Sequence, residues 1–357
     1  MKNDNYFIER DKLNRHQIRD KLKSLPRYCS EYILSMDNTT SSLTRLGYVN
    51  DLTIFFDFIS RYKFGVPVME IEFSHLEKVT SLDISSFLSY LSYYTYNDKN
   101  YKNGEKGKAR KLSSIRSLFK FLFCQDYIKS DVASKVATPK IHEKEIIRLS
   151  TSEVNNIIDE AERPNNLTPR QKSYAKNTSD RDVAILTLFL GTGIRVSELV
   201  GLNIEDVDFE KMSFKVTRKG GNQAVLYFSD EVKYALLNWL DIRATKDVAP
   251  DEKALFISLQ NRRISVRAVE NLVKKYAKAT TPLKNISPHK LRSTYGTSLY
   301  HATQDIYVVA DVLGHKDINT TKRHYAAMSD DLRQKAADKI KLRKDYEELN
   351  DINSEME

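Results

Sequence analysis

The sequence predicts a mostly helical protein of two domains, with one small antiparallel sheet in the second domain. Apolar residues recur with a helical period over long stretches, for example over 43–59 and 112–122. Residues 214–228 instead alternate between apolar and polar around a Gly-Gly pair, which is typical of a β-hairpin. A charged stretch over 135–151 contains Pro139 and interrupts the helical pattern, so it predicts a linker. At about 150 residues a domain, the 357 residues accommodate the two domains that this linker implies.

The charge of the chain favours a polyanionic partner. Lys and Arg total 57 against 48 Asp and Glu, which gives a net charge of +9 and an isoelectric point of about 9.2. Tyr101–Lys120 contains seven basic residues and one acid, whereas Asp345–Glu357 contains six acids and no base. This distribution predicts a nucleic-acid-binding face within the fold and a separate, solvated acidic tail. A merely basic surface is the alternative that charge alone leaves open.

The hydropathy pattern argues against membrane and secreted classes. No apolar run approaches the roughly 20 residues of a membrane span, and the N-terminus lacks the apolar segment of a secretion signal. The two cysteines, Cys29 and Cys124, are too few for a disulfide framework and predict two buried thiols. We therefore expect a cytoplasmic protein with no membrane partner.

The first domain is expected to consist of helices. After the stripe at 43–59, Thr80 or Ser81 caps a helix with apolar residues over 84–91, and the polar stretch 95–109 predicts a loop. The helix at 112–122 has basic residues on either side of its apolar positions. They are Arg110, Lys111, Arg116 and Lys120. This basic side either is simply solvated or contacts the DNA backbone.

The second domain begins where Thr151 or Ser152 starts a new helix. Residues 162–179 are polar and contain two prolines, so they predict a loop or an insertion. Apart from the hairpin, apolar stripes predict further helices in this domain. They cover 183–190, 232–240, 266–276, 291–300 and 308–313, and a last stripe runs from Asp331 onward.

Two short segments of the second domain contain arginines suited to phosphate binding. Arg195 follows the glycine-containing end of a helix, where it is placed to present a fixed guanidinium to a phosphate. His289 and Arg292 are three residues apart, so they share one face of a helix. A histidine in such a place, taken alone, is more often a packed or capping residue.

Three further segments contain polar residues of the kinds used in catalysis. Lys219 lies at the turn of the hairpin, but its segment lacks the residue order of a P-loop. His315 follows Leu313-Gly, and Tyr325 ends the segment from Thr320. Taken singly, these are a solvated lysine, a packed histidine and one of 20 tyrosines. The histidines lack the spacing of a metal site, so no metal is expected.

Together and in this order, the segments resemble the signature of the tyrosine recombinase, or phage integrase, family. The resemblance covers about 150–330 and extends more weakly to the first domain, where Thr44, Tyr48, Asp51 and Leu52 match a family pattern. The sequence is most similar to the Xer-type, XerS-like single-protein recombinases. It departs from the family pattern after the second signature arginine, where Ser293 replaces a frequent histidine, and directly after the tyrosine, where two alanines follow.

The resemblance implies a role for each signature residue, with no cofactor. Arg195 and Arg292 would clamp the scissile phosphate, His315 would be its last ligand, and His289 would act as acid and base. Glu198 would support Arg195.

The same resemblance implies covalent catalysis. Tyr325 would attack the DNA phosphorus, and Lys219 would protonate the leaving 5′-oxygen. The product would be a 3′-phosphotyrosyl link that conserves the bond energy for rejoining.

The resemblance also implies a domain plan. Residues 1–137 would form a helical, SAM-like core-binding domain on DNA, 138–151 a linker, and 152–328 the catalytic domain. Residues 329–357 would be a C-terminal helix and the acidic tail. That helix either packs on its own domain or docks on a neighbouring protomer in a homotetramer on two double-stranded DNA sites.

The expected function is therefore site-specific recombination, of the Xer type that resolves chromosome dimers. Few residues precede the first apolar stripe, which disfavours the alternative of a mobile-element integrase with an added arm-binding domain. A type IB topoisomerase and a non-catalytic DNA-binding protein are further alternatives. The need for a septal DNA translocase as a partner stays open.

Overall fold

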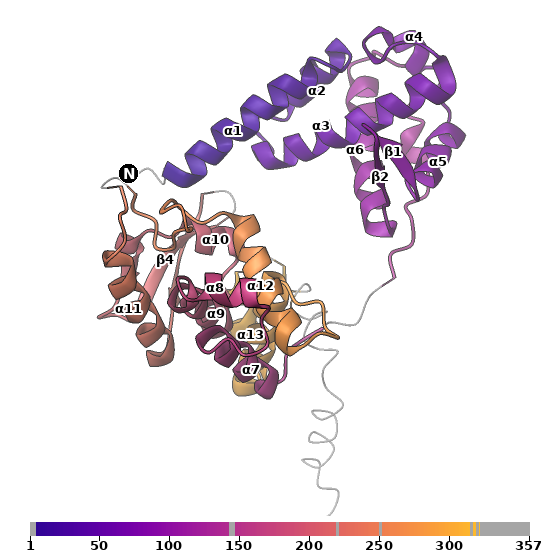
Figure 1. Cartoon of the computed structure of the whole chain (residues 1–357). Coiled ribbons are helices and arrows are strands. Elements are labelled where there is room, and N and C mark those ends of the chain that lie inside the picture. The colour runs from indigo at the N-terminus through magenta and orange to yellow at the C-terminus, as the bar shows by residue number, and fades with distance from the viewer. Residues whose placement is uncertain are drawn as a thin grey trace, which may run out of the picture. The chain divides into compact units, whose positions relative to one another are not determined.

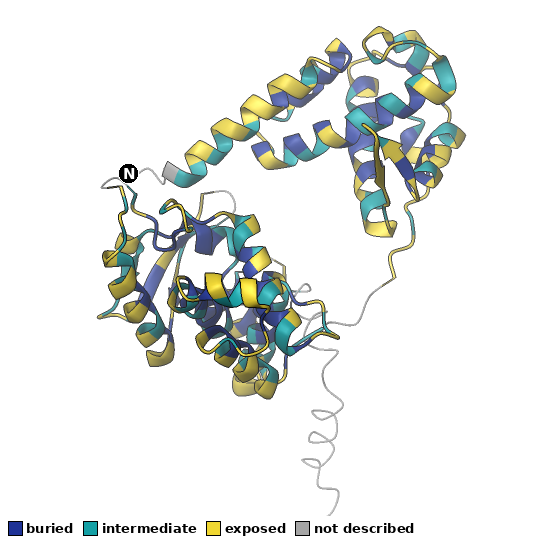
Figure 2. Ribbon diagram, viewed as in Figure 1, coloured by how far each residue is buried: buried dark blue, intermediate teal, exposed yellow. Residues whose placement is uncertain are grey.

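The structure is a computed structural model that describes residues 5–142, 147–218, 221–249 and 252–314, together with residues 317, 318 and 321. The chain divides into two compact units, Met1–Lys144 and Glu145–Glu357 (Figure 1). Both are predominantly helical, and each has its own buried residues (Figure 2). The mostly helical fold class with a small antiparallel sheet is confirmed. Among the described residues, no helix is both long enough and apolar enough to cross a bilayer.

The N-terminal unit is built from helices around an aromatic core. Phe55 on α3 has its ring 5.3 Å from that of Phe87 on α5 and 6.3 Å from that of Phe119 on α6, in edge-to-face contacts. All three rings are fully buried, so they join the three helices. The helices are α1 (Asn5–Leu22), α2 (Arg27–Ser35), α3 (Ser42–Ile59), α4 (Phe73–Leu76), α5 (Ser81–Tyr90) and α6 (Glu105–Cys124). Shorter turns are η1 (Ser60–Phe64), η2 (Val68–Glu70) and η3 (Ala133–Lys135).

The predicted helices of this unit are confirmed, and Thr80 is the residue that caps α5. The prediction of a loop over 95–109 is wrong. The strands β1 (Tyr94–Tyr96) and β2 (Lys99–Tyr101) form a hairpin there, and α6 begins at Glu105. Asn97 and Asp98 both have positive φ, which these side chains tolerate, so polar residues make a tight turn.

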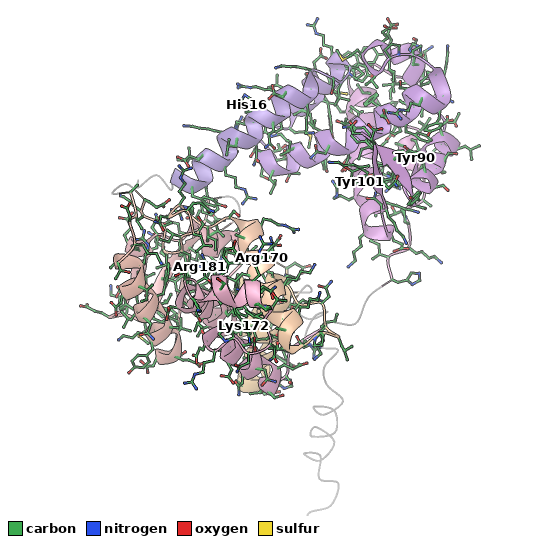
Figure 3. All side chains as sticks on the ribbon, in the orientation of Figure 1. His16, Tyr90, Tyr101, Arg170, Lys172 and Arg181 are labelled. Carbon is green, nitrogen blue, oxygen red and sulfur yellow. The ribbon has the colours of Figure 1, made fainter. Side chains whose placement is uncertain are left out.

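A tyrosine cluster holds this hairpin against α5. The ring of Tyr94 lies 5.4 Å from that of Tyr90 and 5.4 Å from that of Tyr101, the two tyrosines labelled in Figure 3. The prediction of two buried thiols is correct for Cys29 only. Cys124 is exposed because it ends α6 on the side away from the core.

The second unit packs its helices around α9. This helix contacts α7, α11 and α13. Five of its apolar side chains are fully buried: Ala184, Ile185, Leu186, Leu188 and Phe189. The helices are α7 (Thr151–Glu162), α8 (Pro169–Ala175), α9 (Ser179–Thr192), α10 (Val196–Gly201), α11 (Asp230–Ala244), α12 (Val266–Thr280), α13 (Pro288–Thr303) and α14 (Ile306–Leu313), with the turn η4 (Ile204–Asp206).

The predicted hairpin is confirmed as part of a three-stranded antiparallel sheet. Its strands are β3 (Val207–Asp208), β4 (Ser213–Thr217) and β5 (Gln223–Tyr227), in the order β3-β4-β5. Thr217 pairs with Gln223, so the β4–β5 loop is short.

The predicted start of a helix at Thr151 is confirmed, since α7 begins there, and Ser150 caps it in a capping box with Glu153. One prediction for this unit needs correction. The stretch 162–179 is not all loop, since it contains α8, which Thr168 caps and Pro169 starts. The predicted helix from Asp331 lies outside the described residues.

Candidate active site

Arg195 is placed by the sharp turn between α9 and α10. Gly193 ends α9 with a positive φ of 62°, and a Cβ at this position would collide with the ring of Tyr295, so only glycine fits. Two residues later, Arg195 is the N-cap of α10. The prediction of an arginine just after a glycine-containing helix end is therefore confirmed.

Glu198 fixes both the backbone and the side chain of Arg195. The Arg195 backbone N–H donates to Glu198 Oε2 over 3.0 Å, and Arg195 Nη1 donates to Glu198 Oε1 over 2.8 Å. Glu198 is only 4% exposed, whereas the Arg195 side chain is 36% exposed. A buried carboxylate thus orients a guanidinium that still reaches solvent.

Arg292 is held more deeply than Arg195. It lies on α13 and is 6% exposed, and it donates through Nη1 to the Gly193 carbonyl and through Nη2 to the Leu313 carbonyl. His289 lies one turn earlier, in the first turn of the same helix, and is exposed. The hydroxyl of Ser293 donates to the His289 backbone carbonyl over 3.0 Å. The serine that departs from the family pattern is therefore bonded within its own helix.

The two arginines meet at the C-terminal end of α14. Arg195 Nη2 donates to the carbonyls of Leu313, over 3.2 Å, and Gly314, over 3.0 Å, and Arg292 also donates to Leu313. The last carbonyls of a helix lack partners within it and carry partial negative charge. They hold two guanidinium groups from different helices beside each other. We call Arg195 and Arg292 the arginine pair.

Two other signature residues, Lys219 and His315, directly follow the described residues Arg218 and Gly314. Lys219, His315 and Tyr325 themselves lie outside the described residues. Lys219 follows Arg218, whose backbone N–H closes the β4–β5 loop on the Asn222 carbonyl over 2.7 Å.

Sequence reasoning missed Arg218. Its Nη2 donates to the Val312 carbonyl over 3.1 Å, next to the carbonyls that hold the arginine pair. The available signal was its place beside Lys219 in the sequence, which by itself does not indicate a contact with α14.

In the N-terminal unit, two basic residues of α6 pair with a buried carboxylate of α3. Asp51 on α3 is 1% exposed and accepts from Arg110 through both carboxylate oxygens, from Lys111 Nζ over 3.2 Å and from Ser114 Oγ over 2.8 Å. Lys111 is itself 5% exposed. Its expected place on a basic face is therefore corrected, because its ammonium group is buried against Asp51.

The remaining basic residues of α6 differ in exposure. Arg116 donates to the carbonyls of Ala133 and Val136 and to the hydroxyl of Thr138, so it fastens the segment that follows η3. Lys120 is exposed, and about half of the Arg110 side chain is exposed. The surface of α6 that is open to a phosphate thus includes Lys120 and part of Arg110.

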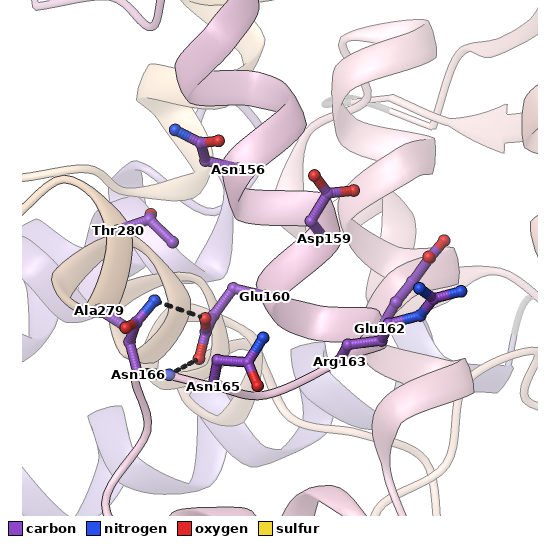
Figure 4. Close-up of a pocket in the computed structure, with 9 residues that line it drawn as sticks. All are labelled: Asn156, Asp159, Glu160, Glu162, Arg163, Asn165, Asn166, Ala279 and Thr280. Carbon is purple, nitrogen blue, oxygen red and sulfur yellow. Dashed lines mark hydrogen bonds between the residues drawn. The ribbon is translucent and has the colours of Figure 1, made fainter.

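A polar cavity of about 670 Å³ lies elsewhere in the second unit, between the end of α7, the loop after it and α12 (Figure 4). Glu160 in its wall accepts from the Asn166 backbone N–H over 2.7 Å and from Asn166 Nδ2 over 2.9 Å. None of the predicted site residues is among those that line it. Across the described ranges, no cluster of His, Cys, Asp and Glu is arranged to hold a metal ion.

Comparison with known proteins confirms the resemblance. The family model described as "Phage integrase family" matches residues 148–331. The tyrosine recombinase XerC of Thermodesulfovibrio yellowstonii is 35% identical over 293 residues, which cover 81% of this chain and 87% of the relative. The tyrosine recombinase XerS of Streptococcus agalactiae is 32% identical over 352 residues, which cover 90% of this chain and 97% of the relative.

A solved structure shares the fold. It is the XerH site-specific recombinase bound to a palindromic difH substrate in a post-cleavage complex, with a TM-score of 0.65 and 17% identity over 90% of this chain and 93% of that one. The fold, the order of the signature residues and the similarity to recombinases over most of the chain agree. The chain belongs to the phage integrase family of tyrosine recombinases, enzymes that break and rejoin DNA.

Proposed function

We propose that this protein is a site-specific recombinase that cuts and rejoins double-stranded DNA through a 3′-phosphotyrosyl intermediate. The observation that carries the proposal is the convergence of Arg195 and Arg292 on the end of α14. Two fixed guanidinium groups can oppose the charge that builds on the non-bridging oxygens of a phosphate under attack. One is buried and one is partly exposed, so the pair offers a positive, hydrogen-bonding surface to an incoming phosphodiester.

In the proposed reaction, the phenol oxygen of Tyr325 attacks the phosphorus as the bond to the 5′-oxygen breaks. A free tyrosine has a pKa near 10, so its proton must be taken up, here by His289. Lys219 gives a proton to the leaving 5′-oxygen, and His315 is a further phosphate ligand. Attack of a 5′-hydroxyl from a second strand reverses the step, so rejoining needs no separate energy source.

We assign DNA binding and catalysis to different units of the chain. Residues 1–137 bind DNA as a core-binding domain, 138–151 are the linker, and 152–328 carry the chemistry. Lys120 and the exposed part of Arg110 are the α6 residues that we assign to the DNA backbone. Residues 329–357 supply a helix for exchange between protomers of a tetramer on two DNA sites, followed by the acidic tail.

The biological role that we propose is Xer-type resolution of chromosome dimers in the cytoplasm, in support of chromosome partition and cell division. Similarity to XerC and XerS tyrosine recombinases over most of the chain supports this role. A septal DNA translocase is the activating partner that such a role calls for.

Covalent trapping tests the reaction. Duplexes that the protein enriches from a randomised palindromic pool are nicked near the cleavage position, so that the cleaved strand leaves and the covalent link persists. The wild-type protein should give a DNA-linked band on a denaturing gel, and Tyr325→Phe should bind the same duplexes without the band. DNA binding with no band from the wild type would contradict recombinase activity.

A further inference from the structure

A third arginine is fixed at the C-terminal end of α14. Arg218 Nη2 donates to the Val312 carbonyl over 3.1 Å, while the next two carbonyls, of Leu313 and Gly314, accept from the arginine pair. Three consecutive carbonyls thus bind three guanidinium groups. Unlike the arginine pair, Arg218 comes from the sheet, since it directly follows β4.

Gly314 leaves the space that Arg218 occupies. It ends α14 with a positive φ of 60°, and a Cβ at this position would collide with the Arg218 guanidinium. The glycine therefore serves two purposes, because it turns the chain and lets the guanidinium lie against the backbone. Arg218 Nε is buried and has no hydrogen-bond partner among the described residues. The side chain is thus packed against α14, unlike an arginine that extends from a turn into solvent.

The backbone of Arg218 closes the β4–β5 loop. Its N–H donates to the Asn222 carbonyl over 2.7 Å, and its carbonyl accepts from the Gly221 N–H over 3.1 Å. The loop between these bonds includes Lys219, the next residue in the sequence. Arg218 therefore ties the start of this loop to α14.

The contacts of the arginine pair show why the loop, rather than the pair, depends on Arg218. Arg195 is also held by Glu198, and Arg292 is also held by the Gly193 carbonyl. Neither contact involves Arg218, so the pair keeps an anchor without it. The loop would lose the contact that Arg218 makes with α14.

We propose that Arg218 is a positioning residue for the cleavage step, which keeps the start of the β4–β5 loop on α14 so that Lys219 can protonate the leaving oxygen. The proposal rests on the proposed function. In that step the bond from Tyr325 to phosphorus forms, the bond from phosphorus to the 5′-oxygen breaks, and that oxygen takes the proton from Lys219. In this proposal Arg218 contacts none of the reacting atoms, and its effect is confined to the delivery of this proton.

A change of leaving group tests the proposal, because a 5′-bridging sulfur needs no proton. Thiols have pKa values near 8.5, so a thiolate leaves readily at neutral pH. Arg218→Met and Arg218→Lys are compared with wild type in single-turnover cleavage of nicked duplexes that carry oxygen or sulfur at the 5′-bridging position. Arg267→Met is the matched control, because Arg267 is an exposed arginine of α12 that pairs with Glu270. DNA affinity and thermal unfolding are measured for each variant.

We expect Arg218→Met to cleave the oxygen substrate about 100-fold more slowly, at the low end of general-acid effects. On the sulfur substrate its rate should return to within about threefold of wild type, as should that of a Lys219→Met reference. Arg218→Lys retains a donor for the Val312 carbonyl and should fall between wild type and Arg218→Met. The control variant should match wild type on both substrates.

Three results would overturn the proposal. Equal losses on the oxygen and sulfur substrates would mean that Arg218 acts through the arginine pair or the fold. Wild-type rates on both would mean that the contact with α14 is dispensable. No covalent product from the wild type on either substrate would refute the proposed function itself. If Arg218→Met is unfolded at the assay temperature, Arg218→Lys replaces it. The ratio of its cleavage rates on the oxygen and sulfur substrates then tests the proposal.

Discussion

Replacing Glu198 with glutamine tests whether the orientation of Arg195 controls cleavage. The carboxylate accepts from the Arg195 backbone N–H through Oε2 and from Nη1 through Oε1, at 3.0 and 2.8 Å. A glutamine amide has one acceptor oxygen, so Glu198→Gln keeps one contact and turns a donor NH₂ toward the other. A hydrogen bond to a charged group is worth about 1.5–3 kcal/mol. If this energy is expressed in the transition state, cleavage slows by about 10- to 150-fold.

Single-turnover cleavage of a nicked duplex by saturating enzyme is the assay. Glu153→Gln is the matched control, because Glu153 caps α7 in the same way that Glu198 caps α10. Glu153 Oε2 accepts from the Ser150 backbone N–H and from Lys284 Nζ, both at 2.7 Å. The control should lose stability in urea unfolding and cleave within about twofold of wild type. Wild-type cleavage by Glu198→Gln, or an equal loss in the control, would refute the reasoning.

Three further predictions concern stability and DNA binding. Burial raises the pKa of Glu153, but hydrogen bonds from Lys284 and from the Ser150 backbone outweigh this effect, so the pKa lies below its usual value. The ionised Glu153 carboxylate therefore stabilises the folded state above the unfolded-state pKa near 4.3, and this stabilisation is lost as pH falls through the folded-state pKa. The difference in unfolding free energy between wild type and Glu153→Gln should accordingly shrink on acidification. Asp51→Asn should cost about 3–5 kcal/mol in urea unfolding, because it leaves buried Lys111 without its counter-charge, and a cost below about 1 kcal/mol would contradict this account. Lys120→Ala should weaken DNA binding and reduce the slope of log affinity against log salt by about one, and an unchanged slope would remove Lys120 from the interface.

Elements with a strong apolar period were predictable from the sequence, and weakly patterned ones were not. Helix α9 lies where a continuous buried stripe predicts it, since every side chain from Ala184 to Phe189 is buried. The β1–β2 hairpin was missed because Asn97 and Asp98 indicate a loop as readily as a tight turn. Helix α8 was missed because its start signals, Thr168 and Pro169, also mark loops.

The candidate site was predictable in its residue types but not in its contacts. The order of the signature residues is a property of the chain, so Arg195, Glu198 and Arg292 could be named in advance. The convergence of the arginine pair on α14 could not be predicted. Arg195 lies 118 residues before Leu313, whose carbonyl accepts its hydrogen bond. The same limit applies to Asp51, which matched a family pattern while its partners on α6 were assigned to DNA.

Identification of the tyrosine that becomes linked to DNA tests the central claim most directly. The covalent product of the wild-type protein is digested with trypsin and nuclease, and the nucleotide-bearing peptide is sequenced by mass spectrometry. We predict that the phosphate is on Tyr325, in the peptide of residues 324–333. A phosphate on any of the other tyrosines, or no linked peptide from duplexes that the protein binds, would contradict the assignment of nucleophile and reaction.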